Sequence, residues 1–223
     1  MIFAENILKW LVAIFVVGIV ILQCRKPRWG VGRLFAWIMN RSHGPLTAWG
    51  LEHVTVGKSD TILDAGCGGG QTLHTLAGMA SEGKVHGIDY SADSVAVARR
   101  TNGELISAGR VDVQRGSVSS LPFPDGTFDL ITAVETHYYW PQPLHDMQEL
   151  QRVLKPGGRL VVIAEAYKRR KYDVLVLVMK MLGGTCLSVR EHQELFATAG
   201  YVDIETFEEP RKGWFSAVAK RPA

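Results

Sequence analysis

The sequence predicts an α/β domain organised around a doubly wound sheet, and residues 61–72, TILDAGCGGGQT, carry most of this prediction. Residues 61–65 have the composition of a short buried strand, and residues 71–80 have the pattern of a helix. Four of the five residues between them are glycines. A strand, a glycine-rich turn and a helix in this order let a backbone approach a nucleotide-like ligand closely. A tight turn that binds nothing has the same order, so the rest of the chain must separate the two.

The spacing of the glycines distinguishes two kinds of ligand. A dinucleotide site requires G-x-G-x-x-G, but counting from Gly66 or Gly68 the third glycine is replaced by Gln71 or Leu73. The chain has acid-x-Gly-x-Gly-x-Gly instead, beginning at Asp64. This run resembles the first motif of class I S-adenosylmethionine (SAM)-dependent methyltransferases. The resemblance implies that the turn accommodates the amino-acid end of SAM, whose ammonium the acid reaches.

A second acid follows the next predicted strand, residues 84–89. Asp89 lies 25 positions after Asp64, where the second acid of a βαβ unit is expected. Its carboxylate can accept hydrogen bonds from both hydroxyls of a ribose. Ser91 is the better N-cap for the helix predicted at residues 93–109, and Tyr90 is placed along the adenine. NAD also carries such a ribose, so Asp89 does not separate the two cofactors.

The run LPFPDGTFDL, residues 121–130, follows a third predicted strand at 111–115. It is similar to the small-molecule methyltransferases related to those that act on ubiquinone and menaquinone precursors. In those proteins an aspartate that binds the adenine amino group usually stands where this chain has Ser117. The resemblance places the Ser117 hydroxyl and the Val118 backbone at the adenine.

A third resemblance is LQRVLKPGGRLVVI, residues 150–163, which begins inside a predicted helix at 144–154 and contains a structural turn at 155–158. Further predicted elements are strands at 128–134, 202–207 and 214–220 and a capped helix at 188–200. The resemblance covers residues 53–220. It implies a Rossmann-like, doubly wound, seven-stranded sheet.

The reacting group is expected beyond the strand at 128–134, because ligands lie at the carboxyl ends of strands in such sheets. His137 is the first candidate for a general base, since its unperturbed pKa is near neutrality, with Tyr138 and Glu135 as second choices. A thiolate acceptor would need no base. The expected catalytic residues are His137 and Tyr138, and the expected SAM-binding residues are Asp64, Gly66, Cys67, Gly68, Gly70, Asp89, Tyr90, Ser117, Val118 and Glu135.

The amino terminus predicts a membrane anchor. Only Lys9 interrupts the apolar run at residues 7–22, and residues 2–22 just reach the length needed to cross a bilayer. A cleaved signal is not favoured, because no basic region precedes the run and no small-x-small site follows it. Arg25, Lys26, Arg28 and Arg33 follow it, which places the domain in the cytoplasm. The predicted division is a transmembrane anchor at 1–24, a juxtamembrane and lid segment at 25–52, and a catalytic domain at 53–223.

The amino-terminal 52 residues have alternative interpretations. An anchor lying in the plane of the membrane is the second choice, although the run lacks a polar face. Gly44-Pro45 is expected to break any helix, and Asn40, His43 and Trp49 are possible lid residues. His43 is equally compatible with a turn or capping role.

The bulk properties limit the function classes. A net charge of +3 does not indicate nucleic-acid binding, and three dispersed cysteines indicate neither a metal site nor disulfides. The prediction is a methyltransferase for a small or lipid-soluble acceptor, with no prediction of oligomeric state. The basic run at 168–171 and the apolar run at 174–182 place acceptor entry on the membrane side. The alternatives are a catalytically silent methyltransferase-fold protein and, less favoured, a nicotinamide-dependent oxidoreductase.

Overall fold

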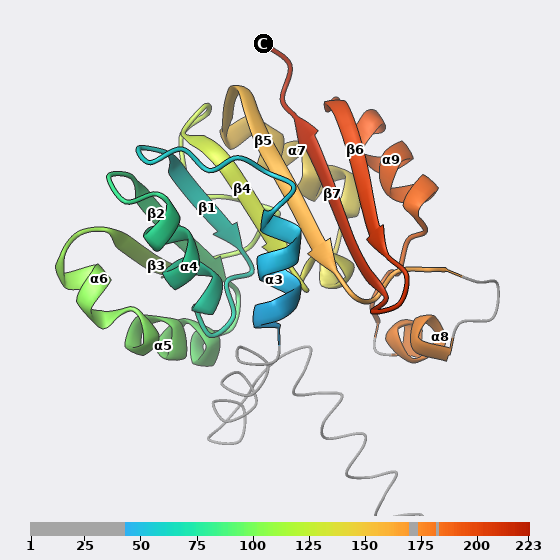
Figure 1. Cartoon of the computed structure of the whole chain (residues 1–223), viewed down its shortest axis with the longest axis horizontal. Coiled ribbons are helices and arrows are strands. Elements are labelled where there is room, and N and C mark those ends of the chain that lie inside the picture. The colour runs from blue at the N-terminus through green and yellow to red at the C-terminus, as the bar shows by residue number, and fades with distance from the viewer. Residues whose placement is uncertain (1–42, 170–173, 182) are drawn as a thin grey trace, which may run out of the picture.

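The computed structural model describes residues 43–169, 174–181 and 183–223, in which seven strands form one sheet (Figure 1). The strand order is β3-β2-β1-β4-β5-β7-β6, with β7 antiparallel to both of its neighbours and the other pairs parallel. The predicted seven-stranded sheet is therefore confirmed. The strands are β1 (Thr61–Ala65), β2 (Lys84–Asp89), β3 (Val111–Arg115), β4 (Phe128–Val134), β5 (Leu154–Ala164), β6 (Val202–Glu209) and β7 (Trp214–Lys220).

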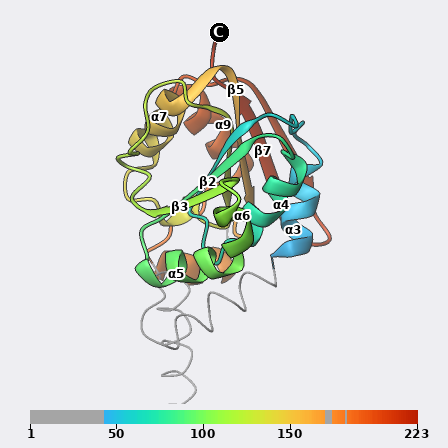
Figure 2. The same ribbon diagram turned by 90° about the vertical axis from the view of Figure 1, so that its left-hand side faces the viewer.

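Helices cover both faces of this sheet. Figure 2 shows α3 and α4 on one face, and α7 and α9 on the opposite face. The helices are α3 (Gly44–Leu51), α4 (Gln71–Met79), α5 (Ala92–Thr101), α6 (Gly103–Ser107), α7 (Pro143–Val153), α8 (Val174–Met181) and α9 (Val189–Thr198), and a 3₁₀ turn, η1, spans His137–Tyr139. The α/β layers thus have the doubly wound arrangement that the sequence predicts.

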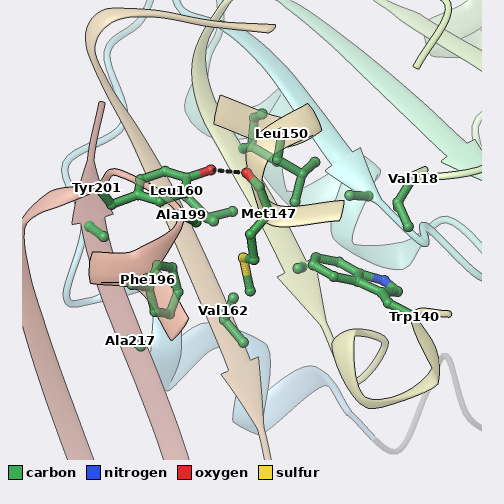
Figure 3. Close-up of a cluster of buried hydrophobic side chains, with 14 of the residues drawn as sticks. Val118, Trp140, Met147, Leu150, Leu160, Val162, Phe196, Ala199, Tyr201 and Ala217 are labelled. Atoms are coloured by element: carbon green, nitrogen blue, oxygen red, sulfur yellow. Dashed lines mark hydrogen bonds between the residues drawn. The ribbon is translucent and has the colours of Figure 1, made fainter. Parts of the chain in front are cut away.

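Alternation along the strands divides the core into two clusters. Ile62 and Leu130, its partner on β4, lie under α3 and α4. Leu63 and its partner Ile131 point to α7 and α9. Successive side chains of a strand point to opposite faces, and full burial of each large apolar side chain stabilises the fold by roughly 1.5–3 kcal/mol. Figure 3 shows part of the second face, where the Tyr201 hydroxyl donates to the Met147 carbonyl at 3.0 Å.

Three local expectations are corrected by the structure. Gly44-Pro45 begins helix α3 instead of breaking it, because proline at the first helical positions loses no intrahelical hydrogen bond. The helix expected at 93–109 is two helices, α5 and α6, separated at Asn102, whose side-chain amide donates to the carbonyls of Gly70 and Ala98. The turn expected at 155–158 is part of β5, whose pairing with β4 shifts register between Phe128 and Leu130.

The caps of two helices agree with the sequence. The Ser91 hydroxyl accepts from the Ser94 N–H at 3.3 Å at the start of α5. Ser188 and Glu191 form a capping box at the start of α9, each side chain accepting from the other's backbone N–H.

The predicted anchor, residues 1–24, lies outside the described residues, as do Asn40 and most of the 25–52 segment. Across 43–169, 174–181 and 183–223, no helix combines the length and the apolar character that a membrane crossing needs.

Candidate functional site

The turn between β1 and α4 contains three glycines in the left-handed region, with φ of 84° at Gly66, 50° at Gly68 and 83° at Gly70. A Cβ on Gly66 would lie 2.2 Å from Thr136 Oγ1, and one on Gly70 would lie 2.8 Å from the Ala98 Cα. A Cβ on Gly68 would meet nothing within 4 Å. Gly66 and Gly70 therefore permit packing of the turn against η1 and α5, whereas Gly68 faces open space.

Cys67 takes part through its backbone. Its N–H donates to the Ile88 carbonyl at 3.0 Å, and its carbonyl accepts from the Gly70 N–H at 2.9 Å. The thiol is buried, and burial raises its pKa well above the ordinary value. The thiol therefore contributes to packing, not to reactive chemistry.

Asp64 lies one residue before the end of β1, inside the domain. Its side chain is 1% exposed, and its Oδ1 accepts from the Thr132 hydroxyl on β4 at 2.6 Å. Burial raises the pKa of this carboxyl to about 7, with the Thr132 hydrogen bond acting in the opposite direction. A cation next to Asp64 would relieve this cost, since it stabilises the ionised form.

Asp89 ends β2 and joins the same turn. Its Oδ2 accepts from the Gly68 N–H at 3.0 Å, and its Oδ1 accepts from the Ser91 N–H at 2.8 Å. The carboxylate thus fixes the open glycine and the start of α5 together. Burial raises its pKa, while these two backbone donors lower it. Tyr90 follows with its side chain 41% exposed.

The loop after β3 carries the residues expected at the adenine. Ser117 is exposed, and its hydroxyl accepts from the Ser119 N–H at 3.2 Å. Val118 is buried and packs in the same cluster as Trp140, as Figure 3 shows. Ser117 and Val118 therefore lie at the edge of the sheet beyond β3.

Glu135 lies just beyond β4 with φ of 55°, a left-handed conformation that is strained for a residue other than glycine. Its Oε1 accepts from the Glu165 N–H at 2.6 Å, and its Oε2 accepts from the Tyr138 hydroxyl at 2.5 Å. His43 Nε2, at the start of α3, is 3.9 Å from Oε2. Burial raises the pKa of Glu135, opposed by His43, Tyr138 and the Glu165 N–H. The structure thus brings together Glu135, Tyr138 and the possible lid residue His43.

His137 points to a different partner. Its Nε2 lies 2.9 Å from His192 Nε2, and His192 Nδ1 lies 2.9 Å from the Ser188 carbonyl oxygen. A carbonyl only accepts, so His192 donates through Nδ1, and His137 must donate through Nε2. Burial and the His192 ring hold the pKa of His137 well below its usual range, and burial lowers that of His192 to about 4. His137 is therefore held neutral in a buried pair, and no described contact joins it to Glu135.

Comparisons with known proteins agree with this geometry. A family profile described as "Methyltransferase domain" matches residues 63–162. The chain is 33% identical to a demethylmenaquinone methyltransferase of Bacillus licheniformis, over 60% of this chain and 59% of that protein. It is 25% identical to the uncharacterized methyltransferase YdaC of Bacillus subtilis, over 84% of this chain and 97% of that protein. A solved SAM-dependent methyltransferase from Aquifex aeolicus superposes with a TM-score of 0.66 at 25% identity, over 78% of this chain and 89% of that one.

Residues 63–162 thus match a methyltransferase-domain family, and the fold is similar to that of a solved SAM-dependent methyltransferase. The chain spans only about half the length of several curated relatives of this kind. In the methyltransferase domain, the carboxyl ends of β1, β2 and β4 bring Asp64, Asp89 and Glu135 to one edge of the sheet. Within the described residues, no group of His, Cys, Asp or Glu is arranged to hold a metal ion.

Four residues of this methyltransferase site were not expected from the sequence: Thr132, Thr136, Glu165 and His192. Thr132 lies among apolar residues of β4, whose other polar residue is Asp129 near the start of the strand, and this irregularity is the one available signal. Thr136, Glu165 and His192 act through tertiary contacts with Gly66, Glu135 and His137. Such contacts join positions far apart in the chain, so periodicity and spacing give no sign of them.

Proposed function

We propose that the protein transfers the methyl group of SAM to a small or lipid-soluble acceptor. The observation that carries this proposal is the open space at Gly68, bordered by a buried acid at the end of each neighbouring strand. A turn whose glycine served packing alone would have a close neighbour, as Gly66 and Gly70 do. Asp64 and Asp89 suit a ligand with a cationic amino group and a ribose.

The residues present fit SAM. Asp64 would face its ammonium, Asp89 and Tyr90 its ribose and adenine edge, and Ser117 and Val118 its adenine. Gly66, Cys67, Gly68 and Gly70 would form the backbone cradle, and Glu135 would border the reacting end. When bound, SAM supplies an electrophilic methyl group on a sulfonium, so the chain's own task is to orient an acceptor and exclude water.

Quinone precursors are the first acceptors to test. Several relatives are named demethylmenaquinone methyltransferase, including those of Lactococcus lactis, at 33% identity, and Symbiobacterium thermophilum, at 40% identity. These names support an aromatic, lipid-soluble acceptor without naming the one used by this chain.

We further propose that a single amino-terminal crossing, residues 1–24, holds the catalytic domain at the cytoplasmic face of a membrane. The support is the apolar run at 7–22 and the four basic residues that follow it. Helix α8 lends support because Leu177 and Met181 are 60% and 79% exposed, the highest values among the large apolar side chains that the structure describes.

Calorimetry on the full chain tests the cofactor. SAM is expected to bind, NADH is not, and a protein that binds neither would be a silent member of the fold. Gly68→Val should fill the open space, and Asp89→Ala should remove the expected ribose acceptor. We expect each variant to lower the SAM affinity at least tenfold. If both variants remain folded and bind SAM as tightly as the parent, the assignment fails.

A further inference from the structure

Glu135 is the described titratable group at this edge that combines a strained backbone, a satisfied carboxylate and partial access. Its side chain is 13% exposed, whereas His137 is 5% exposed as a residue and is engaged with His192. Thr136, the next residue, has its hydroxyl against Gly66 of the glycine turn. Glu135 is therefore adjacent to the turn that would cradle the reacting end of SAM.

We propose that Glu135 is the general base of the transfer, and that the acceptor is a protic group such as a phenol-like hydroxyl or an acidic carbon. The inference rests on the proposed function and specifies its acceptor class. An acceptor that is already a thiolate would have no need of this carboxylate.

The hydrogen bonds define the state of the base. The Tyr138 hydroxyl and the Glu165 N–H both donate to the carboxylate, and both hydrogen bonds favour its ionised form. Its remaining lone pairs can take a proton. Burial raises the pKa of Glu135 above the ordinary value, so this carboxylate is a stronger base than an exposed glutamate.

The step balances in atoms and charge. The acceptor atom gives its proton to Glu135 Oε2 and forms a bond to the methyl carbon. The bond between that carbon and sulfur breaks, and its electron pair stays on sulfur. One positive sulfonium and one negative carboxylate become a neutral thioether and a neutral carboxyl, so no other reactant is required.

Three groups face the carboxylate and act as positioning residues. Tyr138 comes from η1, Glu165 from the end of β5, and His43 from the start of α3. His43, when protonated, and the Tyr138 hydroxyl favour the ionised form, whereas the Glu165 carboxylate disfavours it.

The first readout is the Glu135 carboxyl itself, followed by infrared difference spectra of the full chain, parent minus Glu135→Gln, across pH without SAM. The band of the protonated carboxyl is expected to form with a midpoint pH above the ordinary range for glutamate. This midpoint should be higher still in Tyr138→Phe and in His43→Leu, since each variant loses a group that favours the ionised form. A band that titrates in the ordinary range in all three proteins overturns the inference.

The second readout uses two probes, 1-naphthol and thiophenol, at pH 8. Loss of a general base typically costs on the order of 100-fold or more, so Glu135→Gln should lose at least that factor with 1-naphthol. With thiophenol, which ionises without help, it should stay within threefold of the parent. In Tyr138→Phe, the acid limb of the profile of 1-naphthol methylation rate against pH should move to higher pH, because the Glu135 pKa is raised. Tyr139→Phe, a neighbouring hydroxyl loss on η1, is the matched control and should leave this limb in place.

The outcomes separate this inference from the proposed function. A parent chain that fails to bind SAM refutes the proposed function. A parent that binds SAM but leaves 1-naphthol unmethylated refutes the protic acceptor class alone. Equal loss with both probes in Glu135→Gln, or equal rates in that variant and the parent, refutes the base role.

Discussion

The buried carboxyl group of Asp64 destabilises the ligand-free fold when it is ionised, yet the ionised form is the one expected to bind the ammonium of SAM. Its pKa in the folded chain is raised to about 7, above the ordinary 3.8, so the folded state holds its proton more tightly than the unfolded state does. The stability of the SAM-free protein should therefore fall as the pH rises from about 4 to about 7, and should remain low above this window. The shift corresponds to at most about 4 kcal/mol.

Asp64→Asn tests this directly. The amide oxygen can still accept from Thr132, but no charge is buried at high pH. Urea unfolding without SAM should show the variant to be more stable than the parent at pH 8 and nearly equal at pH 4. The parent's SAM affinity should fall as the pH drops below 7, and the variant's should be low throughout. Asp203→Asn, at a side chain 61% exposed, is the control and should show neither effect. A parent whose stability does not change between pH 4 and 8 contradicts the account.

At the scale of elements, the glycine turn shows that similar residues have different tasks. Gly70→Ala would place a methyl group 2.8 Å from the Ala98 Cα at a φ of 83°, so α4 would have to move from α5. Gly68→Ala would be strained at a φ of 50° but would meet nothing. A left-handed alanine costs roughly 1–2 kcal/mol, and backbone displacement adds a further 1–3 kcal/mol.

We therefore expect Gly70→Ala to lower the free energy of unfolding by roughly twice as much as Gly68→Ala, measured by urea unfolding without SAM. Gly68→Ala should nevertheless lower the SAM affinity more, relative to its loss of stability, because a Cβ at Gly68 would enter open space expected to hold the ligand, whereas one at Gly70 would meet Ala98. Equal stability losses would show that α4 adjusts freely. An unchanged SAM affinity in Gly68→Ala would remove the support for a ligand there.

The elements also show what a sequence can predict. The strands were predictable because buried, β-branched runs such as β1 and β4 end at glycine or at an acid, and both bounds agree with the structure. Asp64, Asp89 and Glu135 were predictable as a group, since the carboxyl ends of adjacent parallel strands meet at one edge. The prediction that Gly44-Pro45 breaks any helix was wrong. Glycine followed by proline is as typical of the first residues of a helix as of a loop.

Contacts between distant segments were beyond the sequence. The order of choice among His137, Tyr138 and Glu135 rested on unperturbed pKa values, and burial changes all three. His192, which lies 55 positions from His137, occupies the Nε2 atom of His137. His43, which immediately precedes α3, lies 3.9 Å from the Glu135 carboxylate. The run LPFPDG is likewise held by Arg152 on α7, which donates to the Leu121 and Phe123 carbonyls and to Asp125. That resemblance thus reflects packing as much as ligand contact.

At the scale of the whole molecule, several features lie at one edge. The strands β1, β4 and β5 end there, α3 begins there, and α8 lies beside it, whereas the chain's carboxyl terminus lies at the opposite edge (Figure 1). Residue 43, where the described chain begins, is therefore on the side of Glu135 and the glycine turn. A membrane anchor joined to the domain at residue 43 would hold the acceptor side of the domain toward the bilayer.

This arrangement predicts that exposed apolar residues of α8 assist acceptor entry from the membrane. The full chain should stay with membranes after high-salt and carbonate washes, and release by carbonate would contradict the predicted crossing. Replacing both Leu177 and Met181 with serine should change the free energy of unfolding little, since both are exposed. In vesicles containing anionic lipid, the double variant should methylate a vesicle-embedded, long-chain naphthol several-fold more slowly than the parent.

The control replaces Met79 and Val202 with serine, at exposed apolar sites near the end of α4 and the start of β6. Because α4 begins at the glycine turn and β6 runs parallel to β5, both sites lie at the edge away from α8. This variant should match the parent with the embedded probe, and both double variants should match the parent with water-soluble 1-naphthol. Equal slowing in the two double variants would mean that loss of apolar surface in general, not the position of α8, affects turnover. If the Leu177 and Met181 double variant methylates the embedded probe as fast as the parent, the acceptor enters from water.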